Sequence, residues 1–189
     1  FEKRDKSKLC VSNICVNKTS QLQFSMIIKL FGITNVQIAP TKLVDSWKDL
    51  NKIDLKIYTD KGLNVYALQS ITFNLNNLNI FDVKTQDDLY NHLTNVIDFA
   101  EAYGIKTIVF GCPRNRKILK FNAKNDKIFI KFFEKIGKYL KDKNVVICIE
   151  NNSKKYNCNY INTINECSKI VRKINHENIK MMVDIGNVV

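Results

Sequence analysis

Short apolar segments recur along the chain and alternate with longer segments of mixed character. The short segments are rich in β-branched and aliphatic side chains and are bounded by Lys, Asn, Asp or Gly, a pattern typical of buried strands. They lie at Leu9–Val16, Asn35–Ala39, Asn64–Leu68, Thr107–Phe110, Val145–Ile149 and Lys180–Val183. The pattern therefore predicts six strands.

The longer segments carry apolar residues at the spacing of one helix face. The first clear case is the series Leu89, Leu93, Val96, Ile97 and Ala100. This i, i+4, i+7, i+8 stripe is that of an amphipathic helix. The segments 128–140 and 164–174 repeat it, so helices are predicted between the strands.

Local signals mark the ends of these helices. Thr85 with Asp88, and Thr163 with Glu166, have the spacing of a capping box, in which the hydroxyl accepts a free backbone N–H and the acid reaches back. Three glycines each precede an apolar residue and then a strand, namely Gly32, Gly62 and Gly104. A glycine at that place supplies the left-handed turn that ends a helix.

Strict alternation of strands and helices predicts a parallel sheet covered by helices. Two α/β architectures fit that pattern equally well, an open doubly wound sheet and a (β/α)8 barrel. A barrel needs about 250 residues, so this chain would contain only about six βα units. Neither G-x-G-x-x-G after the first strand nor G-x-x-x-x-G-K-[ST] occurs, which removes the main support for a nucleotide-binding doubly wound fold.

The composition is that of a globular chain, with 189 residues, 45% hydrophobic and 25% charged. Apolar runs fall short of the roughly 18 residues of a membrane span, and no apolar run follows the charged N-terminus as in a signal peptide. We therefore expect no membrane partner and a cytoplasmic protein. The six cysteines form no C-x-x-C pair, which fits a reducing compartment.

The net charge of +12, from 30 basic and 18 acidic residues, allows non-specific attraction to polyanions. The basic residues are mostly Lys, spread along the chain and mixed with acids. We interpret them as a solvated surface, so a nucleic-acid partner is not expected.

Two carboxylates follow apolar strands, where they have no packing value. Glu150 follows the run VVICI and Asp184 follows KMMV. In parallel α/β folds the chemistry gathers at the C-terminal ends of strands, so these side chains are candidates for binding Mg²⁺ or Mn²⁺ in preference to Zn²⁺. The alternative is that each caps a helix or binds backbone in a turn.

Polar residues at the other strand ends are candidates for substrate binding. Arg114 and Arg116 share one loop, and paired guanidinium groups suit a phosphate or carboxylate; the alternative is a solvated loop or a structural ion pair. Amide side chains that could bind a polyol are Asn13, Gln37, Gln69 and Asn152. The two histidines, His92 and His176, fit a structural or exposed role better than a catalytic one.

Taken together, the strand ends resemble the sugar phosphate isomerase/epimerase family, within the xylose isomerase-like TIM barrels. The matching pieces, in the family's order, are VSNIC at 11–15, VQIAPTKL at 36–43, YALQSITFN at 66–74, LNIF at 78–81, IVFGCPRNR at 108–116, IEN at 149–151 and VDIGN at 183–187. The resemblance implies one barrel domain over residues 1–189 that lacks strands seven and eight.

The resemblance also implies roles for single residues. Glu150 is similar to the family's strand-five metal ligand, which also moves a proton, and Asp184 to the strand-six ligand. The other two ligands, usually His and Glu on strands seven and eight, have no counterpart in this chain. Asn187 stands where related members often have His and would contact substrate. Metal binding should accordingly be weak or lacking.

The activity implied is isomerisation or epimerisation of a sugar or sugar phosphate by proton transfer next to a carbonyl. The metal would stabilise the enediolate and Glu150 would move the proton. With half of that machinery, this chain by itself should be inactive as an isomerase. A second copy could cover the open strand edges, so a homo-oligomer is one expectation.

Two other functions remain open. One is a catalytically incomplete barrel that acts as a carbohydrate-binding module. The other, less favoured, is a DNA-repair enzyme similar to the endonucleases that act at abasic sites. Those enzymes use several histidines, and the corresponding strand ends here carry none.

Overall fold

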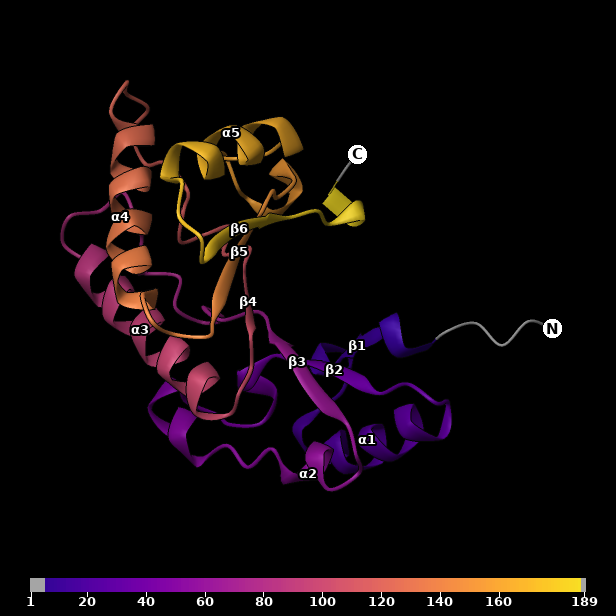
Figure 1. The fold of residues 1–189 in the computed structure, drawn as a ribbon. Helices are drawn as coiled ribbons and strands as arrows, with labels where there is room; N and C mark the ends of the chain where they lie inside the picture. Colours follow the sequence, from indigo (N-terminus) through magenta and orange to yellow (C-terminus); the bar gives the residue numbers. More distant parts are fainter. Residues whose placement is uncertain (1–5, 188–189) are drawn as a thin grey trace. The chain divides into compact units, whose positions relative to one another are not determined.

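The structure, a computed structural model, describes residues 6–187. Within this range the chain forms two compact units, one ending at Gln69 and one beginning at Ser70 (Figure 1). All six predicted strands are present, and helices separate them.

The first unit holds three parallel strands in chain order. Its strands and main helices are β1 (Cys10–Ser12), α1 (Gln21–Leu30), β2 (Asn35–Ile38), α2 (Lys56–Thr59) and β3 (Asn64–Leu68). Short 3-10 helices lie at Asn13–Cys15, Lys18–Ser20, Pro40–Lys42 and Trp47–Lys52. In register, Ser12 pairs with Gln37, and the β2–β3 pairing shifts between Val36 and Gln37. Polar side chains thus arrive side by side at the ends of β1 and β2.

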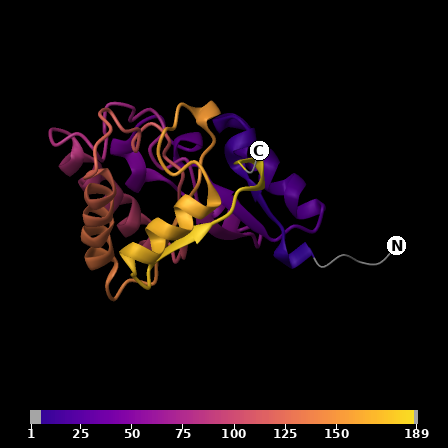
Figure 2. The same ribbon diagram turned by 90° about the horizontal axis from the view of Figure 1, so that it is seen from above.

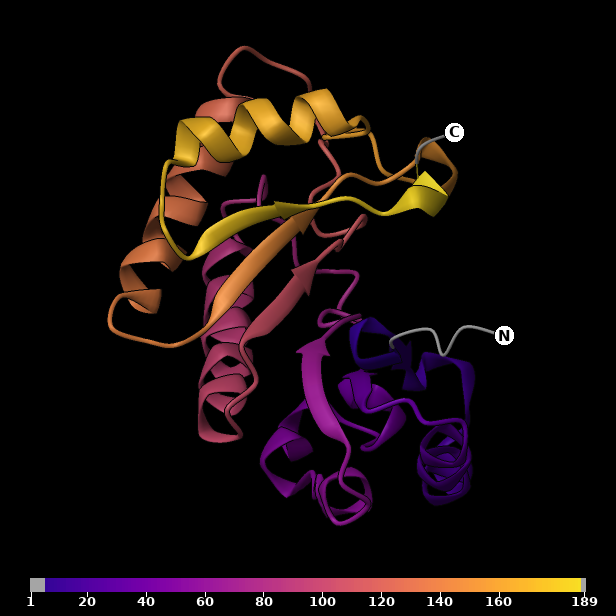
Figure 3. The ribbon, with the colours of Figure 1, turned by 45° about the vertical axis from the view of Figure 1, so that its right-hand side comes forward.

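The second unit holds the other three strands, again parallel and in chain order. Its elements are α3 (Gln86–Ala102), β4 (Thr107–Phe110), α4 (Asn125–Leu140), β5 (Val146–Glu150), α5 (Ile164–Ile174) and β6 (Ile179–Met182), with 3-10 helices at Lys154–Tyr156 and Ile185–Asn187. Helix α5 lies along both α4 and β6 (Figures 2 and 3). The helices therefore form a layer against the three strands.

Aromatic side chains pack this helical layer onto the sheet. The Phe110 ring of β4 meets Phe133 of α4 edge-to-face with centroids 5.0 Å apart. Phe129, one turn earlier in α4, lies 4.7 Å from Phe133 and 5.2 Å from Tyr160. Because such rings bury large apolar areas, they fix the loop that follows β5 against α4.

The first predicted strand is shorter than expected. Strand β1 ends at Ser12, whose hydroxyl accepts a hydrogen bond from the Ile14 backbone N–H at 3.1 Å. This contact starts the 3-10 helix Asn13–Cys15. The apolar pattern continues to Val16, but the serine side chain competes with the strand for the backbone.

One of the two predicted capping boxes is correct. Thr163 accepts from the Glu166 N–H at 3.1 Å, and Glu166 accepts from the Thr163 N–H at 3.0 Å. The box predicted at Thr85 is wrong, because its hydroxyl instead accepts from the Asn79 backbone N–H at 3.1 Å. The predicted left-handed glycines are confirmed, with φ of +73° at Gly32, +68° at Gly62 and +67° at Gly104.

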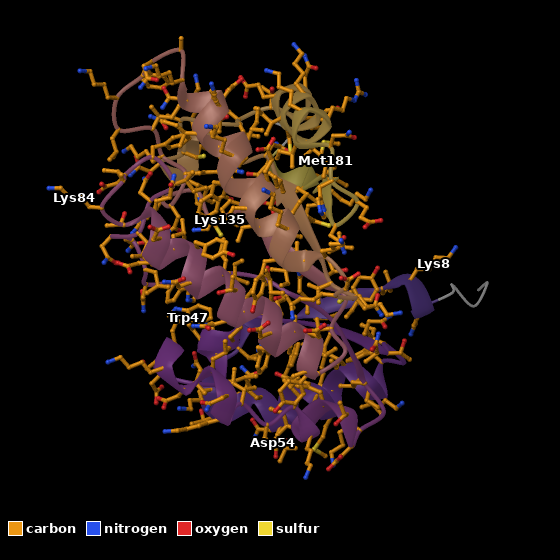
Figure 4. All side chains as sticks on the ribbon, turned by 60° about the vertical axis from the view of Figure 1, so that its left-hand side comes forward. Lys8, Trp47, Asp54, Lys84, Lys135 and Met181 are labelled. Carbon is orange, nitrogen blue, oxygen red and sulfur yellow. The ribbon has the colours of Figure 1, made fainter. Side chains whose placement is uncertain are left out.

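Many side chains that end in nitrogen project outward from the ribbon, and three of the labelled ones are lysines (Figure 4). Lys84 projects away from the ribbon, whereas Lys135 of α4 lies over the Tyr90 ring at 3.8 Å and pairs with Asp87 of α3 at 3.0 Å. Such exposed pairs contribute little to stability. Within residues 6–187, no helix is both long and apolar enough to cross a membrane.

Candidate carboxylate site

Glu150 is the last residue of β5, and its Oε1 atom accepts two hydrogen bonds. The donors are Nδ2 of Asn152 at 2.8 Å and Nδ2 of Asn187 at 3.0 Å. Side chains alternate along a strand, so Glu150 points to the face opposite Ile147 and Ile149, which are fully buried. The apolar residues of β5 therefore pack one face and aim the carboxylate at the other.

Burial raises the pKa of Glu150 above its ordinary value, and the negative charge of Asp184 raises it further. Three groups oppose this rise by stabilising the charged form: the Arg116 guanidinium and the amides of Asn152 and Asn187. The higher pKa agrees with the expectation for two neighbouring carboxylates. Its largest cause is burial, however, and repulsion comes second.

Asp184 lies just after β6 and is joined to Glu150 through a single amide nitrogen. Nδ2 of Asn187 donates to Asp184 Oδ2 at 2.8 Å as well as to Glu150 Oε1 at 3.0 Å. Oε1 of Glu150 and Oδ2 of Asp184 are therefore closer to each other than the sum of these two hydrogen-bond distances. Asn187 is held in turn by the Ser153 N–H at 3.1 Å, and Asp184 Oδ1 accepts from the Gly186 N–H at 2.8 Å. The structure thus brings the two predicted metal ligands together.

Arg116 is fully buried next to this pair, with 0% of its surface exposed. Its Nη2 donates to Oδ1 of Asn152 at 2.8 Å. Its Nε and Nη1 atoms, and Oδ1 of Asn151, are buried without a hydrogen-bond partner in the described part of the chain. Arg114, in contrast, is exposed. Of the two predicted anion-binding arginines, only Arg114 presents its guanidinium to solvent.

The donors at this site fit a hard divalent cation only in part. Carboxylate oxygens are the ligands that Mg²⁺ and Mn²⁺ prefer, and Oε2 of Glu150 has no hydrogen-bond partner among residues 6–187. Over the same residues, no group of three or more His, Cys, Asp or Glu side chains is placed to hold a metal ion. Glu150 and Asp184 could therefore supply two ligands, leaving the others to water or substrate.

A second polar group lies at the strand ends of the first unit. Gln69, just after β3, donates from Nε2 to the hydroxyl of Ser12 at the end of β1. Gln37 pairs with Ser12 in the register of β1 and β2 and is half-buried. Gln37 and Gln69 thus keep the strand-end position that a substrate-binding role requires.

Asn13 lies elsewhere, in a buried network of the same unit. Its Nδ2 donates to Gln21 Oε1 at 3.3 Å and to the Tyr58 hydroxyl at 3.4 Å, and its Oδ1 accepts from the Ala39 N–H at 2.7 Å. Asn13 and Tyr58 are 0% exposed. The amide is fully used inside the protein, so the structure gives Asn13 no group with which to bind substrate.

Both histidines have structural positions. His92 Nε2 lies 2.6 Å from the Ile71 carbonyl oxygen, and burial lowers the pKa of His92. His176 accepts from the Asn178 N–H at 3.1 Å and packs on Gly137, where an added Cβ would lie 2.7 Å from the imidazole. These contacts agree with the structural role expected for both residues.

Asparagines that the sequence did not single out tie the loop after β4 in place. Nδ2 of Asn79 donates to the carbonyl oxygens of Arg114 at 3.2 Å and Lys117 at 2.9 Å. Asn159 accepts from the Ile118 N–H at 2.7 Å and donates to the Ile118 carbonyl at 3.0 Å. The chain contains many asparagines, so residue type alone does not identify the ones that hold a loop. Only their position near the strand ends could have indicated this role.

The sequence and structure were also compared with known proteins. A family model described as xylose isomerase-like TIM barrel matches residues 27–189. Among curated proteins, none matches the sequence significantly. A solved 3-keto-D-glucoside 4-epimerase from E. coli is similar, with a TM-score of 0.71 and 14% identity over 96% of this chain and 69% of its own.

Two further solved structures are similar. A D-psicose 3-epimerase, determined in the presence of D-fructose, has a TM-score of 0.66 and 16% identity over 88% of this chain and 58% of its own. A xylose isomerase-like TIM barrel protein from Mycobacterium smegmatis, in complex with magnesium, has a TM-score of 0.65 and 13% identity over 95% of this chain and 65% of its own.

At such low identity these likenesses establish the fold, and they confirm the TIM-barrel type that the family resemblance implied, whereas the strand and helix pattern alone left an open sheet equally possible. The chain spans 58% to 69% of the length of these three solved proteins. The family model covers most of the chain. This chain therefore belongs to the xylose isomerase-like TIM barrel family.

Proposed function

We propose that this chain takes part in isomerisation or epimerisation of a sugar or sugar phosphate by moving a proton next to a carbonyl. The observation that carries the proposal is the carboxylate pair, Glu150 and Asp184, joined through Asn187 Nδ2 at the C-terminal ends of β5 and β6. Similar solved proteins are sugar epimerases.

Glu150 is the proposed base, and its two oxygens have different roles. Oε1 is held by Asn152 and Asn187, whereas Oε2 has no partner within the described chain. The proton would therefore be taken up on one lone pair of Oε2, which leaves the other lone pair for a cation. The raised pKa of Glu150 brings this carboxylate closer to neutral pH, where a general base works best.

Glu150 and Asp184 would also hold a divalent cation, Mg²⁺ or Mn²⁺ rather than Zn²⁺. When bound, that ion would act as a Lewis acid on the substrate carbonyl. The similar protein in complex with magnesium favours this choice. With two ligands from this chain, binding should be weak.

In the second unit, which also holds this carboxylate pair, exposed Arg114 would offer a guanidinium for a phosphate. Within the first unit, Gln37 and Gln69 would offer amides at strand ends for hydroxyl groups. Asn152 and Asn187 already hold Glu150, so we assign them to orienting the base. Asn13 and Arg116 are buried and are left out of direct substrate contact.

Proton exchange tests the proposal directly, because it requires only the base Glu150 and not the second carboxylate that complete isomerisation would need. The chain would be incubated in D₂O with a panel of ketoses and ketose phosphates and with Mn²⁺, and deuterium next to the carbonyl would be followed by NMR. Exchange that is lost in Glu150→Gln and kept in Arg172→Gln, an exposed substitution on α5, supports the proposal. Calorimetry should show weak Mn²⁺ binding that Asp184→Asn removes.

The outcomes separate the proposed enzyme from a binding module. Sugar binding without exchange at any Mn²⁺ concentration would favour the carbohydrate-binding module. A chain that shows neither exchange nor Mn²⁺ binding contradicts the proposal.

A further inference from the structure

Burial of the Arg116 side chain does not by itself stabilise the fold. Its guanidinium is fully buried, yet only Nη2 has a hydrogen bond, and Nε and Nη1 have none within the described residues. A buried charge with unmatched donors destabilises a fold unless a nearby charge compensates it. The negative charge of Glu150 is close enough to be influenced by Arg116. The position of Arg116 therefore points toward the carboxylate site.

The loop that carries Arg116 is fixed before the residue and after it. Nδ2 of Asn115, the preceding residue, donates to the Leu75 carbonyl at 2.7 Å and the Leu78 carbonyl at 2.8 Å. On the other side, Asn159 holds both the N–H and the carbonyl of Ile118. With both flanks tied, the loop delivers the guanidinium to one place and loses little freedom in doing so.

The place it reaches is the carbonyl side of the Asn152 amide. Nη2 of Arg116 donates to Oδ1 of Asn152 at 2.8 Å, and Nδ2 of Asn152 donates to Oε1 of Glu150 at 2.8 Å. An amide rotated by half a turn would place Oδ1 against the carboxylate and its N–H groups against the guanidinium. Both contacts would then be repulsive. The arginine thus decides which end of the amide faces Glu150.

We infer that Arg116 is a positioning residue that acts through Asn152 to hold the Glu150 carboxylate in one orientation. This inference rests on the proposed function of Glu150. It explains why a charged residue is kept in the interior at the end of β4. It also gives Arg116 a role different from that of exposed Arg114 in the same loop.

The unmodified chain provides the first test. By NMR in metal-free buffer, the side-chain amide protons of Asn152 should exchange with solvent more slowly than those of Asn144, which is exposed. The Asn152 signals are assigned by their loss in Asn152→Asp. Asn152 protons that exchange as fast as those of Asn144 would overturn the inference, because the amide would not be held.

Variants then test the role of the arginine. In Arg116→Met the Asn152 amide signals should shift and exchange faster, whereas Arg172→Gln, which removes an exposed arginine, should leave them unchanged. Arg116→Lys, which keeps a donor and a charge, should restore them in part. A folded Arg116→Met with unaltered Asn152 signals contradicts the inference. If Arg116→Met does not fold, the measurement on the unmodified chain and Arg116→Lys still decide.

Activity provides an independent measurement. For proton exchange, Arg116→Met should lower kcat by about 10–100-fold, as for groups that orient a ligand from behind, with little change in KM. Asn152→Asp should lower it equally, and the double variant no further. If the chain shows no exchange at all, the proposed function fails, while the Asn152 signals still test the positioning of the amide.

Discussion

The two units of this chain use buried polar networks in opposite ways. In the first unit, Asn13, Gln21 and Tyr58 form a neutral network whose amide and hydroxyl groups bind one another and the backbone. In the second, Arg116 and Glu150 carry charge, and part of the guanidinium has no partner among the residues described. Both networks lie next to strand ends, so their place in the fold does not separate them.

What separates the networks is how completely their hydrogen-bonding groups are satisfied. A neutral network with every group paired adds rigidity and specifies one packing. A network with buried charge and open donors costs stability, and such features concentrate at functional sites. The difference indicates a structural role for the first network and a chemical role for the second.

The largest effect should come from breaking the neutral network. Asn13→Ala leaves the buried Ala39 N–H unpaired, at about 1–3 kcal/mol, and removes the hydrogen bonds to Gln21 and Tyr58, which still bind each other. The free energy of unfolding should therefore fall by about 3 kcal/mol. Chemical denaturation measures this. Asn17→Ala, at an exposed position that makes no capping bond, is the matched control. An equal loss in both variants would contradict a structural role for Asn13.

A smaller loss is expected from Asn187→Asp in the charged network. The change replaces the bridging donor with a third carboxylate beside Glu150 and Asp184, and should cost roughly 1–3 kcal/mol in EDTA. Because a higher ligand charge strengthens binding of hard cations, Mn²⁺ should recover stability more in this variant than in the unmodified chain. The exposed substitution Asn144→Asp should show neither effect. If Mn²⁺ stabilises Asn187→Asp no more than it stabilises Asn144→Asp, the prediction is refuted.

Glu150→Gln should stabilise the chain slightly at neutral pH. The folded pKa of Glu150 is raised above its ordinary value of 4.5, so the folded state holds this proton more tightly than the unfolded state. Stability contributed by the protonated form is therefore lost as pH rises from 4.5 through the raised pKa. Thermal unfolding can be followed from about pH 4 to about pH 8, a range that includes this titration. The melting temperature should depend less on pH in Glu150→Gln than in the unmodified chain. An identical profile would argue against burial of the carboxylate.

The least effect at neutral pH is expected at His92, which lies outside both networks. Burial lowers its pKa from 6.5, so the neutral form is favoured by folding. Stability should be lost as pH falls from 6.5 through the lowered pKa. His92→Gln, which keeps a donor for the Ile71 carbonyl, should reduce this acid sensitivity while matching the unmodified chain at pH about 8. A steeper acid loss in the variant would show that the histidine is not the group responsible.

Several features of the fold could be predicted from the sequence because they depend on local patterns. The strands from Asn35, Asn64 and Thr107 begin where the apolar pattern places them, and the capping box at Thr163 is present. Thr85 shows the limit of such reasoning. It has the same spacing as Thr163, but a neighbouring loop offers the Asn79 N–H to its hydroxyl.

The candidate site was predictable in kind but not in detail. A carboxylate after an apolar strand has no packing role, so Glu150 and Asp184 could be recognised from their position. The partners of those carboxylates could not. Asn13 and Asn152 are both asparagines near strand ends, yet one closes a neutral core and the other holds Glu150.

The sequence by itself therefore determined the order of strands and helices, the strand ends that carry acids, and the resemblance to a barrel family. Tertiary structure decided which of these polar groups are paired, which are buried and which face Glu150. The physical reason is the separation along the sequence over which each kind of interaction acts. Periodicity and capping act over a few residues, whereas Asn187 and Glu150 are 37 residues apart and Arg116 and Asn152 are 36 residues apart.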